Sequence, residues 1–292
     1  MRFLLPLLLL LAFPGVASAA TISSTGDAVS FQTDLGETND GELRLSDDGQ
    51  QLVFLEHASN LAAGLGCTEV MTGEVTCPAS GVTRAGVELG DNDDRFVVRL
   101  GSASAPSVFI EGGDGTDLVI YTGTTPVSIS LDNTANDGPE GRGDDIRFDV
   151  ENVTGTDAAD AITGSAGPNM LNGGLGVDTY ACGGGVDIVD GDKTDQVGPD
   201  CEIVARDSRV KLTNGNDKFK PFRPGLYVFG RRGNDILRGG PGNDSLSGDR
   251  GDDKIRVRGG KRDVVSCGKG RDKVTADKKD KVSKDCEKVS RK

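Results

Sequence analysis

The residues best suited to chemistry in this chain are aspartates that recur at position six of nine-residue units. The units GGDGTDLVI (112–120), GGLGVDTYA (173–181) and GGPGNDSLS (239–247) follow the pattern Gly-Gly-x-Gly-x-Asp-x-apolar-x. The aspartate offers a hard carboxylate oxygen, and the glycines let a tight turn run close to an ion. Ca²⁺ takes about six to eight oxygen ligands and accepts irregular geometry, so the pattern predicts calcium binding.

Two arrays hold these units in register. The first spans residues 155–190, and the second spans 212–256 and, after a one-residue slip, 258–275. Isolated copies lie upstream at 89–97 and 112–120. The x-apolar-x tail of each unit predicts a short strand whose middle side chain points inward. The sequence therefore predicts an all-β solenoid in which each turn contacts only its neighbours.

The register predicts which aspartates share a site. If two nonapeptides form one turn, then units n and n+2 stack on the same edge of the solenoid. Asp217, Asp235 and Asp253 then occupy successive turns, and Asp160 and Asp178 form another pair. Backbone carbonyls of adjacent turns together with these paired carboxylates could supply the ligands of Ca²⁺.

The opposite edge is predicted to be weaker. Asn169 replaces aspartate opposite Asp187, and Leu226 replaces it opposite Asp244. Three arginines also lie within loops of the second array that should bind a cation. Ordinary Gly-Asp turns without a metal are the alternative, and it weighs most for these degenerate units.

Six cysteines suggest three disulfides in an exported chain. The block CGGGVDIVDGDKTDQVGPDCE (182–202) matches CGKGRDKVTADKKDKVSKDCE (267–287) position by position. This internal similarity predicts the pairs Cys182–Cys201 and Cys267–Cys286, which leaves Cys67–Cys77. Each block ends an array, so each is predicted to be a disulfide-closed cap. A metal–thiolate or redox site is disfavoured, because the chain has no CxxC and its only histidine is His57.

The N-terminus predicts export. Residues 1–20, MRFLLPLLLLLAFPGVASAA, read as a secretory signal peptide, with an apolar run and small residues at a cleavage site. The chain is therefore predicted to be secreted, where calcium is available and disulfides persist. The remainder divides into a β-rich region (21–150), the first array with its cap (151–202) and the second array with its basic cap (203–292).

The composition also favours a solenoid over an ordinary globular core. The chain has 43 Gly, no Trp and 3 Tyr among 292 residues, whereas large aromatics usually dominate a core. Small Val, Ile and Leu side chains must then be buried by stacking along a narrow solenoid. High glycine content and net charge also suit disorder, but the regular apolar position argues against that alternative when calcium is present.

At this point the chain resembles the hemolysin-type (RTX) calcium-binding repeat proteins, and in detail their secreted actinobacterial members. The nonapeptides carry the first resemblance; segments 66–96 and 130–156 and the two Cys-ended caps carry the second. The resemblance implies a right-handed parallel β-roll that binds Ca²⁺ and often folds only in its presence. By position, it implies carboxylate ligands at Asp117, Asp160, Asp178, Asp187, Asp217, Asp235, Asp244, Asp253 and Asp272.

The chain departs from that family in two respects. Gram-negative relatives carry a C-terminal export signal and attach their repeats to a toxin, lipase or protease domain, whereas this chain has a predicted N-terminal signal and no recognisable catalytic domain. The Lys and Arg residues of the last array also weaken the expectation that its calcium sites are filled.

The sequence does not predict an enzyme. It has no GxSxG, HExxH or GxxxxGK[ST] motif, and repeat ligation accounts for most of its carboxylates. The expected function is a structural or cell-surface adhesion module that folds on binding calcium. The alternative is an extracellular hydrolase or cytolysin that carries an RTX module, and residues 21–150 would have to supply its active domain.

Charge divides unevenly along the chain. Residues 203–292 hold 25 Lys and Arg against 13 Asp and Glu, whereas residues 1–202 hold 8 against 33. The basic end could dock on an anionic cell-envelope polymer. Alternatively, its lysines could solvate an edge, block aggregation and pair with the acidic half. Nucleic acid is an unlikely partner, because no aromatic residues are interleaved for base stacking.

Overall fold

The computed structural model describes residues 19–291 except 103, 207 and 222–223, and this described part of the chain is all-β, without a helix. The all-β prediction is therefore confirmed. Most of the predicted signal peptide lies outside the described residues, but Ala19 and Ala20 begin the first strand, β1. Within the described ranges, no helix is long and apolar enough to cross a membrane.

One sheet covers one side of the N-terminal region. Its strands, in spatial order, are β14 (Asp145–Ile146), β10 (Ser107–Glu111), β8 (Arg84–Glu88), β2 (Ala28–Gln32), β1 (Ala19–Thr25) and β5 (Asn60–Ala63). Strands β1 and β2 form an antiparallel hairpin, and the other pairs are parallel. The region that was predicted only as β-rich thus contains parallel pairs in this sheet, beside antiparallel pairs such as β3–β4 and β4–β7 elsewhere.

A second, long sheet runs through the whole described chain. Its order is β30 (Lys281–Val282), β28 (Val264–Ser266), β26 (Ser245–Ser247), β24 (Tyr227–Phe229), β22 (Arg209–Lys211), β21 (Ile203–Arg206), β19 (Ile188–Gly191), β17 (Met170–Asn172), β15 (Asn152–Thr154), β11 (Leu118–Tyr121), β9 (Arg95–Arg99), β3 (Asp40–Leu45), β4 (Gln51–Glu56), β7 (Glu74–Pro78) and β6 (Thr68–Met71). The antiparallel pair β21–β22 joins the two arrays.

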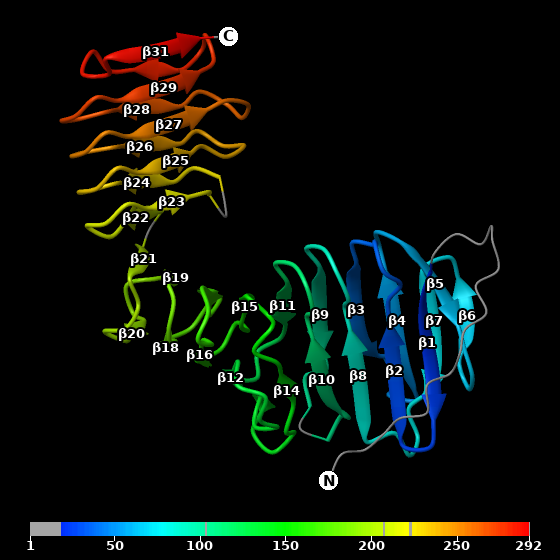
Figure 1. The fold of residues 1–292 in the computed structure, drawn as a ribbon. Helices are drawn as coiled ribbons and strands as arrows, with labels where there is room; N and C mark the ends of the chain where they lie inside the picture. Colours follow the sequence, from blue (N-terminus) through cyan, green and yellow to red (C-terminus); the bar gives the residue numbers. More distant parts are fainter. Residues whose placement is uncertain (1–18, 103, 207, 222–223, 292) are drawn as a thin grey trace.

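Each array has its own second sheet. The second sheet of the first array begins upstream of it, and its order is β13 (Gly138–Pro139), β12 (Val127–Ser130), β16 (Ala161–Thr163), β18 (Thr179–Ala181) and β20 (Gln196–Val197). In the second array it is β23 (Lys218–Phe219), β25 (Ile236–Arg238), β27 (Lys254–Val257), β29 (Lys273–Ala276) and β31 (Lys288–Arg291). Figure 1 shows the second array as a stack of short strands that ends at β31.

The arrays pair strands that lie two nonapeptides apart. Ile162 is in register with Tyr180, and Leu237 is in register with Ile255, both in parallel pairs with an 18-residue offset. The middle residue of each x-apolar-x tail is buried, with Leu237 and Val274 fully inaccessible. Burying one such side chain stabilises a fold by roughly 1.5–3 kcal/mol. The predicted stacking of units n and n+2 is therefore confirmed.

The buried residues form two hydrophobic clusters. One cluster extends from β1 to Val189 and so includes both the N-terminal region and the first array. The other extends from Ile203 to Cys286 in the second array. The scarce aromatics concentrate in the N-terminal region, where the Phe31 ring contacts those of Phe54 and Phe96. The narrower arrays bury mainly Val, Ile and Leu, as the composition predicts.

Three disulfides close the fold as the matching cysteine blocks predict. They are Cys67–Cys77, Cys182–Cys201 and Cys267–Cys286, with Cα–Cα distances of 4.4, 5.2 and 5.1 Å. The last two each tie the final turn of an array to an earlier unit. A covalent link at these ends limits fraying of a stack whose last turn has a neighbour on one side only.

Candidate metal centre

A row of carboxylates, which we call the carboxylate ladder, follows each edge of the arrays. The main-chain N–H of Asp217 donates to Asp235 Oδ1 at 2.9 Å, and that of Asp235 donates to Asp253 Oδ1 at 2.8 Å. The N–H of Asp253 in turn donates to Asp272 Oδ1 at 2.8 Å. Each position-six aspartate is thus anchored to the equivalent residue of the next turn, as the predicted stacking requires.

The same hydrogen bond recurs along the other edges of the fold. It joins Asp94 to Asp117, Asp160 to Asp178, Asp178 to Asp195, Asn169 to Asp187, Asp244 to Asp263, and Asp263 to Asp280, with N–O distances of 2.7 to 3.1 Å. One carboxylate oxygen of each aspartate is therefore committed to holding the stack together.

Glutamates end three of these rows. Glu151 Oε2 accepts from the N–H of Asp117 at 2.9 Å, and Glu287 Oε2 accepts from that of Asp272 at 2.8 Å. Glu202 Oε2 takes the same place beyond Asp187 at 3.0 Å. Glu202 and Glu287 follow directly after the cap cysteines, where no further nonapeptide supplies an aspartate. A side chain longer by one methylene therefore satisfies the last exposed N–H.

The second oxygen of many ladder aspartates has no protein partner. The Oδ2 atoms that are buried and accept no hydrogen bond within the described part of the chain belong to Asp94, Asp117, Asp187, Asp235, Asp253, Asp263 and Asp272. A buried, ionised and unpaired oxygen is strongly unfavourable, because it has lost its hydration without gaining a donor. Either a proton on the carboxylate or a bound cation would remove this cost.

Burial also changes the acidity of the ladder. Desolvation, together with the charge of neighbouring carboxylates, raises the pKa of Asp235 and of Asp253 to about 6. Desolvation likewise raises the pKa of Asp117 to about 7 and that of Asp187 to about 6. Stacked anions thus disfavour one another's ionised form.

Backbone oxygens converge beside the unpaired carboxylate oxygens. A Cβ added to Gly230, the first residue of its unit, would lie 2.6 Å from Asp235 Oδ2 and 2.6 Å from the carbonyl oxygen of Gly248. Glycine therefore leaves space between a carboxylate of one turn and a carbonyl of the next. Carboxylate and carbonyl oxygens are the ligands that Ca²⁺ takes, so the residues present fit that ion.

Carboxylates alone do not complete such a site. In the described part of the chain, Cys267, Asp285 and Cys286 are the only group of three or more potential side-chain ligands whose atoms lie close together. Both of these cysteines are committed to a disulfide. A cation at the ladder would therefore depend on backbone carbonyls for most of its ligands.

Three of the predicted ligands differ from the rest. Asp160 is the first position-six aspartate of the first array, and the Thr156 hydroxyl donates to both of its carboxylate oxygens at 3.0 and 3.1 Å. Thr213 makes the same contacts to Asp217, the first aspartate of the second array, at 2.8 and 3.0 Å. Asp244 accepts N–H bonds on both oxygens, at 3.0 Å from Leu226 and 2.7 Å from Gly240. At these three residues, hydrogen-bond donors of the protein thus satisfy both carboxylate oxygens, which leaves less need for a cation.

The other predicted ligands stay predictions with structural support. Asp117, Asp187, Asp235, Asp253 and Asp272 each keep an unpaired Oδ2. Asp178 is buried, and its Oδ1 accepts the N–H of Asp160.

Sequence reasoning missed two equivalent aspartates. Asp94 and Asp263 hold position six in LGDNDDRFV and RGGKRDVVS, and their Oδ2 atoms are buried and unpaired. Their position in the nonapeptide was therefore sufficient to predict both residues as ligands. Asp195 and Asp280 also join the ladder, but they lie in the caps outside the nonapeptide register.

The loop arginines do not neutralise the ladder. Arg231, Arg232 and Arg250 are exposed, and the charges that shift the pKa values of Asp235 and Asp253 are all carboxylates. The expectation that basic residues weaken the second array's sites stays a prediction; at Asp263 the charge of Lys279 opposes the rise in pKa that burial causes.

Comparison with protein families also identifies calcium-binding repeats in the two arrays. The family model of the RTX calcium-binding nonapeptide repeat, with four copies, matches residues 154–189 and 227–255. Over these residues the chain is similar to RTX repeats. The matched RTX segments contain Asp178, Asp187, Asp235 and Asp253, but they cover less than a quarter of the chain. A comparison with curated proteins found no match.

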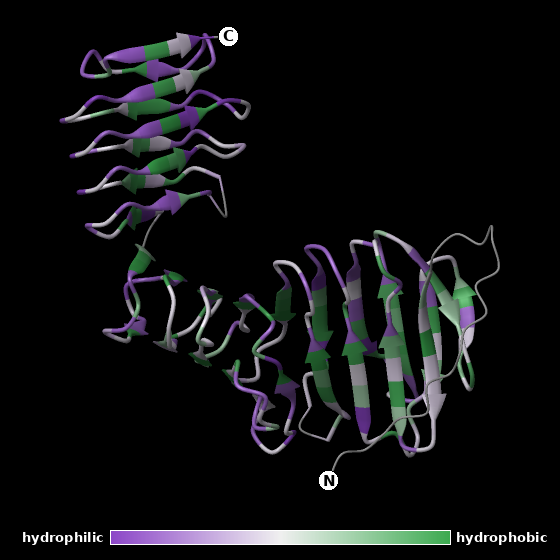
Figure 2. Cartoon of the chain, in the orientation of Figure 1, coloured by the Kyte–Doolittle hydropathy of each residue, from purple (hydrophilic) through white to green (hydrophobic). Residues whose placement is uncertain are grey.

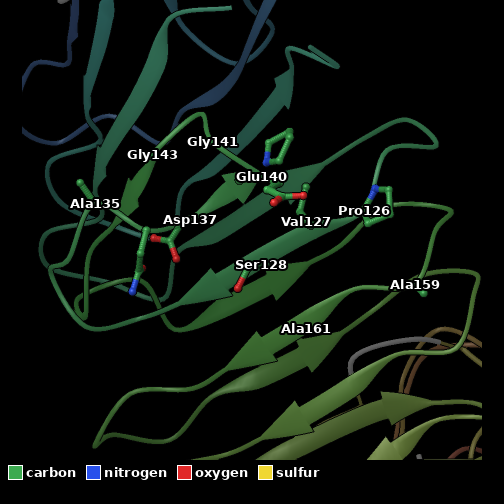
Figure 3. Close-up of a pocket in the computed structure, with 13 residues that line it drawn as sticks. Pro126, Val127, Ser128, Ala135, Asp137, Glu140, Gly141, Gly143, Ala159 and Ala161 are labelled. Atoms are coloured by element: carbon green, nitrogen blue, oxygen red, sulfur yellow. The ribbon is translucent and has the colours of Figure 1, made fainter. Parts of the chain in front are cut away.

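A groove in the described chain borders the start of the first matched RTX segment, through Ala159 and Ala161. It has a volume of about 600 Å³ and lies between the 135–143 loop and strands β12 and β16 (Figure 3). Its titratable side chains are Asp137 and Glu140. Asp137 accepts main-chain N–H bonds from Ser130 and Ile146 on its two oxygens, at 2.6 and 2.7 Å, so it anchors the loop.

The raised pKa values predict an unusual pH dependence. Burial raises the pKa of Asp117 to about 7 and those of Asp235 and Asp253 to about 6, from an ordinary value near 4, so the folded state binds more protons between these values. Without calcium, stability should therefore fall as the pH rises from about 4.5 to about 7.5. Thermal melts in a chelating buffer check this. A melting temperature that rises across this window would contradict it.

Proposed function

We propose that the chain is an exported, non-enzymatic calcium-binding β-solenoid that serves as a structural or cell-surface module. Its arrays would form a right-handed parallel β-roll that folds when calcium binds. The observation that carries this proposal is the row of buried, unpaired Oδ2 atoms beside backbone carbonyls. The RTX match over 154–189 and 227–255 supports the choice of ion.

The residues proposed to hold calcium are those whose second carboxylate oxygen is unpaired. In the second array these are Asp235, Asp253, Asp263 and Asp272, with carbonyls such as that of Gly248. Bound calcium supplies positive charge to the stacked carboxylates. The protein residues hold the turns in register through their Oδ1 atoms, so that binding and stacking reinforce each other.

A calcium titration of the oxidised chain tests the proposal. Circular dichroism and thermal melting should show a gain of β-structure and a higher melting temperature as calcium rises to millimolar concentration. Each filled site adds about 2.7 kcal/mol when free calcium is 100 times its dissociation constant. Magnesium, which demands near-octahedral geometry, is the control and should have a much smaller effect. A melting temperature that is indifferent to calcium would refute the proposal.

A further inference from the structure

One face of the second array presents cations in register. In sheet β23-β25-β27-β29-β31, Phe219, Leu237, Ile255 and Val274 are buried, so the residues on either side of each lie on the outer face. Lys218, Ile236, Lys254, Lys273 and Lys288 are aligned in one column across the sheet. Arg238, Arg256, Thr275 and Ser290 form the second column.

We define the cationic face as the exposed basic residues of this surface, which are Lys218, Lys220, Arg238, Lys254, Arg256, Lys273 and Lys288. Within the described residues, none of them forms an ion pair or a side-chain hydrogen bond. Figure 2 shows hydrophilic residues beside hydrophobic ones along these strands. The alternative that these cations pair with the acidic half of the chain is therefore not what the structure shows.

The charge is specific to this face. The matching surface of the first array carries Ser128, Ala161, Thr179 and Gln196 in register, which are all uncharged. The same solenoid geometry therefore forms without cations. Lysines that only block aggregation are needed on an edge strand, such as β31, whereas Lys254 and Arg256 lie on the central strand β27.

A groove runs between the two columns. One segment, of about 220 Å³, is lined by residues of β25, β27 and β29, including Arg238, Lys254 and Arg256. A second segment, of about 360 Å³, is lined by Lys218, Lys220, Ile236 and Arg238. Because Ile236 and Arg238 line both segments, the groove is continuous from β23 to β29. It crosses strands that are spaced ~4.8 Å apart.

We propose that this groove binds a single linear anionic polysaccharide laid across the strands. Cations line both sides of the groove, so an extended chain with a regularly spaced negative charge meets a partner at successive strands. Among its described residues, the face has no exposed aromatic side chain on which nucleic-acid bases could stack. Of the outward-facing residues that the structure describes here, the half-buried Ile236 is the only large apolar one that could enter a bilayer. The proposal extends the proposed function and does not depend on calcium-induced folding.

Binding of dextran sulfate, with uncharged dextran as control, tests the proposal. The full oxidised chain is assayed at saturating calcium and several salt concentrations. The triple variant Lys254→Gln, Arg256→Gln, Lys273→Gln should weaken binding about tenfold and flatten its dependence on salt. The matched triple Lys211→Gln, Lys261→Gln, Arg262→Gln removes the same charge outside the cationic face and should change binding less than about twofold.

Circular dichroism melts establish that both triples fold, which separates a loss of binding from a loss of structure. Equal weakening by the two triples would overturn the proposal, because the interaction would then depend on net charge alone. Tighter binding to single-stranded DNA or to phosphatidylglycerol vesicles than to dextran sulfate, at matched anion concentration, would also overturn it. A failure of calcium-induced folding alone would leave this comparison intact.

Discussion

Replacing Asp235 and Asp253 together with asparagine should abolish most of the calcium response of the second array. Each substitution keeps an Oδ1 that can accept the main-chain N–H of the preceding turn, from Asp217 at residue 235 and from Asp235 at residue 253. The change removes the ionised Oδ2 that is buried without a partner. The double variant should therefore gain stability without calcium and lose affinity for it.

The matched control is Asp252→Asn, which removes a neighbouring charge that is exposed. Asparagine already occupies the equivalent position at Asn234, so the substitution fits the loop. Isothermal titration calorimetry should show at least one calcium fewer per chain for the double variant and the full number for the control. An unchanged calcium stoichiometry in the double variant would contradict the ladder as the metal centre.

The second large effect is expected from Gly251→Ala. Gly251 has a φ of +135°, and an added Cβ would overlap the carbonyl group of Gly233 in the turn before it. The stack would have to separate locally, at a cost of roughly 2–5 kcal/mol from the disfavoured backbone and the overpacking together. Calcium should restore only part of this loss, because the clash lies between main chains.

Gly259→Ala separates the two causes. Gly259 also has a positive φ, of +86°, but no atom lies within 4 Å of an added Cβ. This variant should lose only about 1–2 kcal/mol, from the backbone conformation. Chemical unfolding of both variants at saturating calcium measures the difference. Equal losses would show that close packing of turns contributes nothing beyond the glycine backbone.

The arrays were predictable because the spacing of residues within the repeat determines both which side chains enter the core and which carboxylates lie side by side. An apolar residue two positions after each aspartate places Leu237 and Ile255 in the core, and the 18-residue period places Asp235 beside Asp253. The cysteine pairs followed from the matching of two blocks. In each case a local pattern, repeated without change, determines the contact.

The features that the sequence did not predict depend on contacts that the repeat pattern does not specify. The carboxylates of Asp160 and Asp217 are occupied by Thr156 and Thr213, because a hydroxyl stands four residues earlier in each first unit. The cationic face required the register of β25 with β27 and β29, since charge counts alone do not separate an outer face from a loop. The N-terminal strands have no period from which to predict their partners.

The position of the glutamates has a consequence for how the arrays can change in length. Glu202 and Glu287 close rows of N–H groups at the end of each array, and their blocks also carry the cap disulfides. An inserted pair of nonapeptides would add one complete turn and leave both terminators with their present partners. A single inserted nonapeptide would move each row to the opposite edge and separate it from its glutamate. Such solenoids should therefore tolerate growth in whole turns, at a point well before the cap, and reject growth by half a turn.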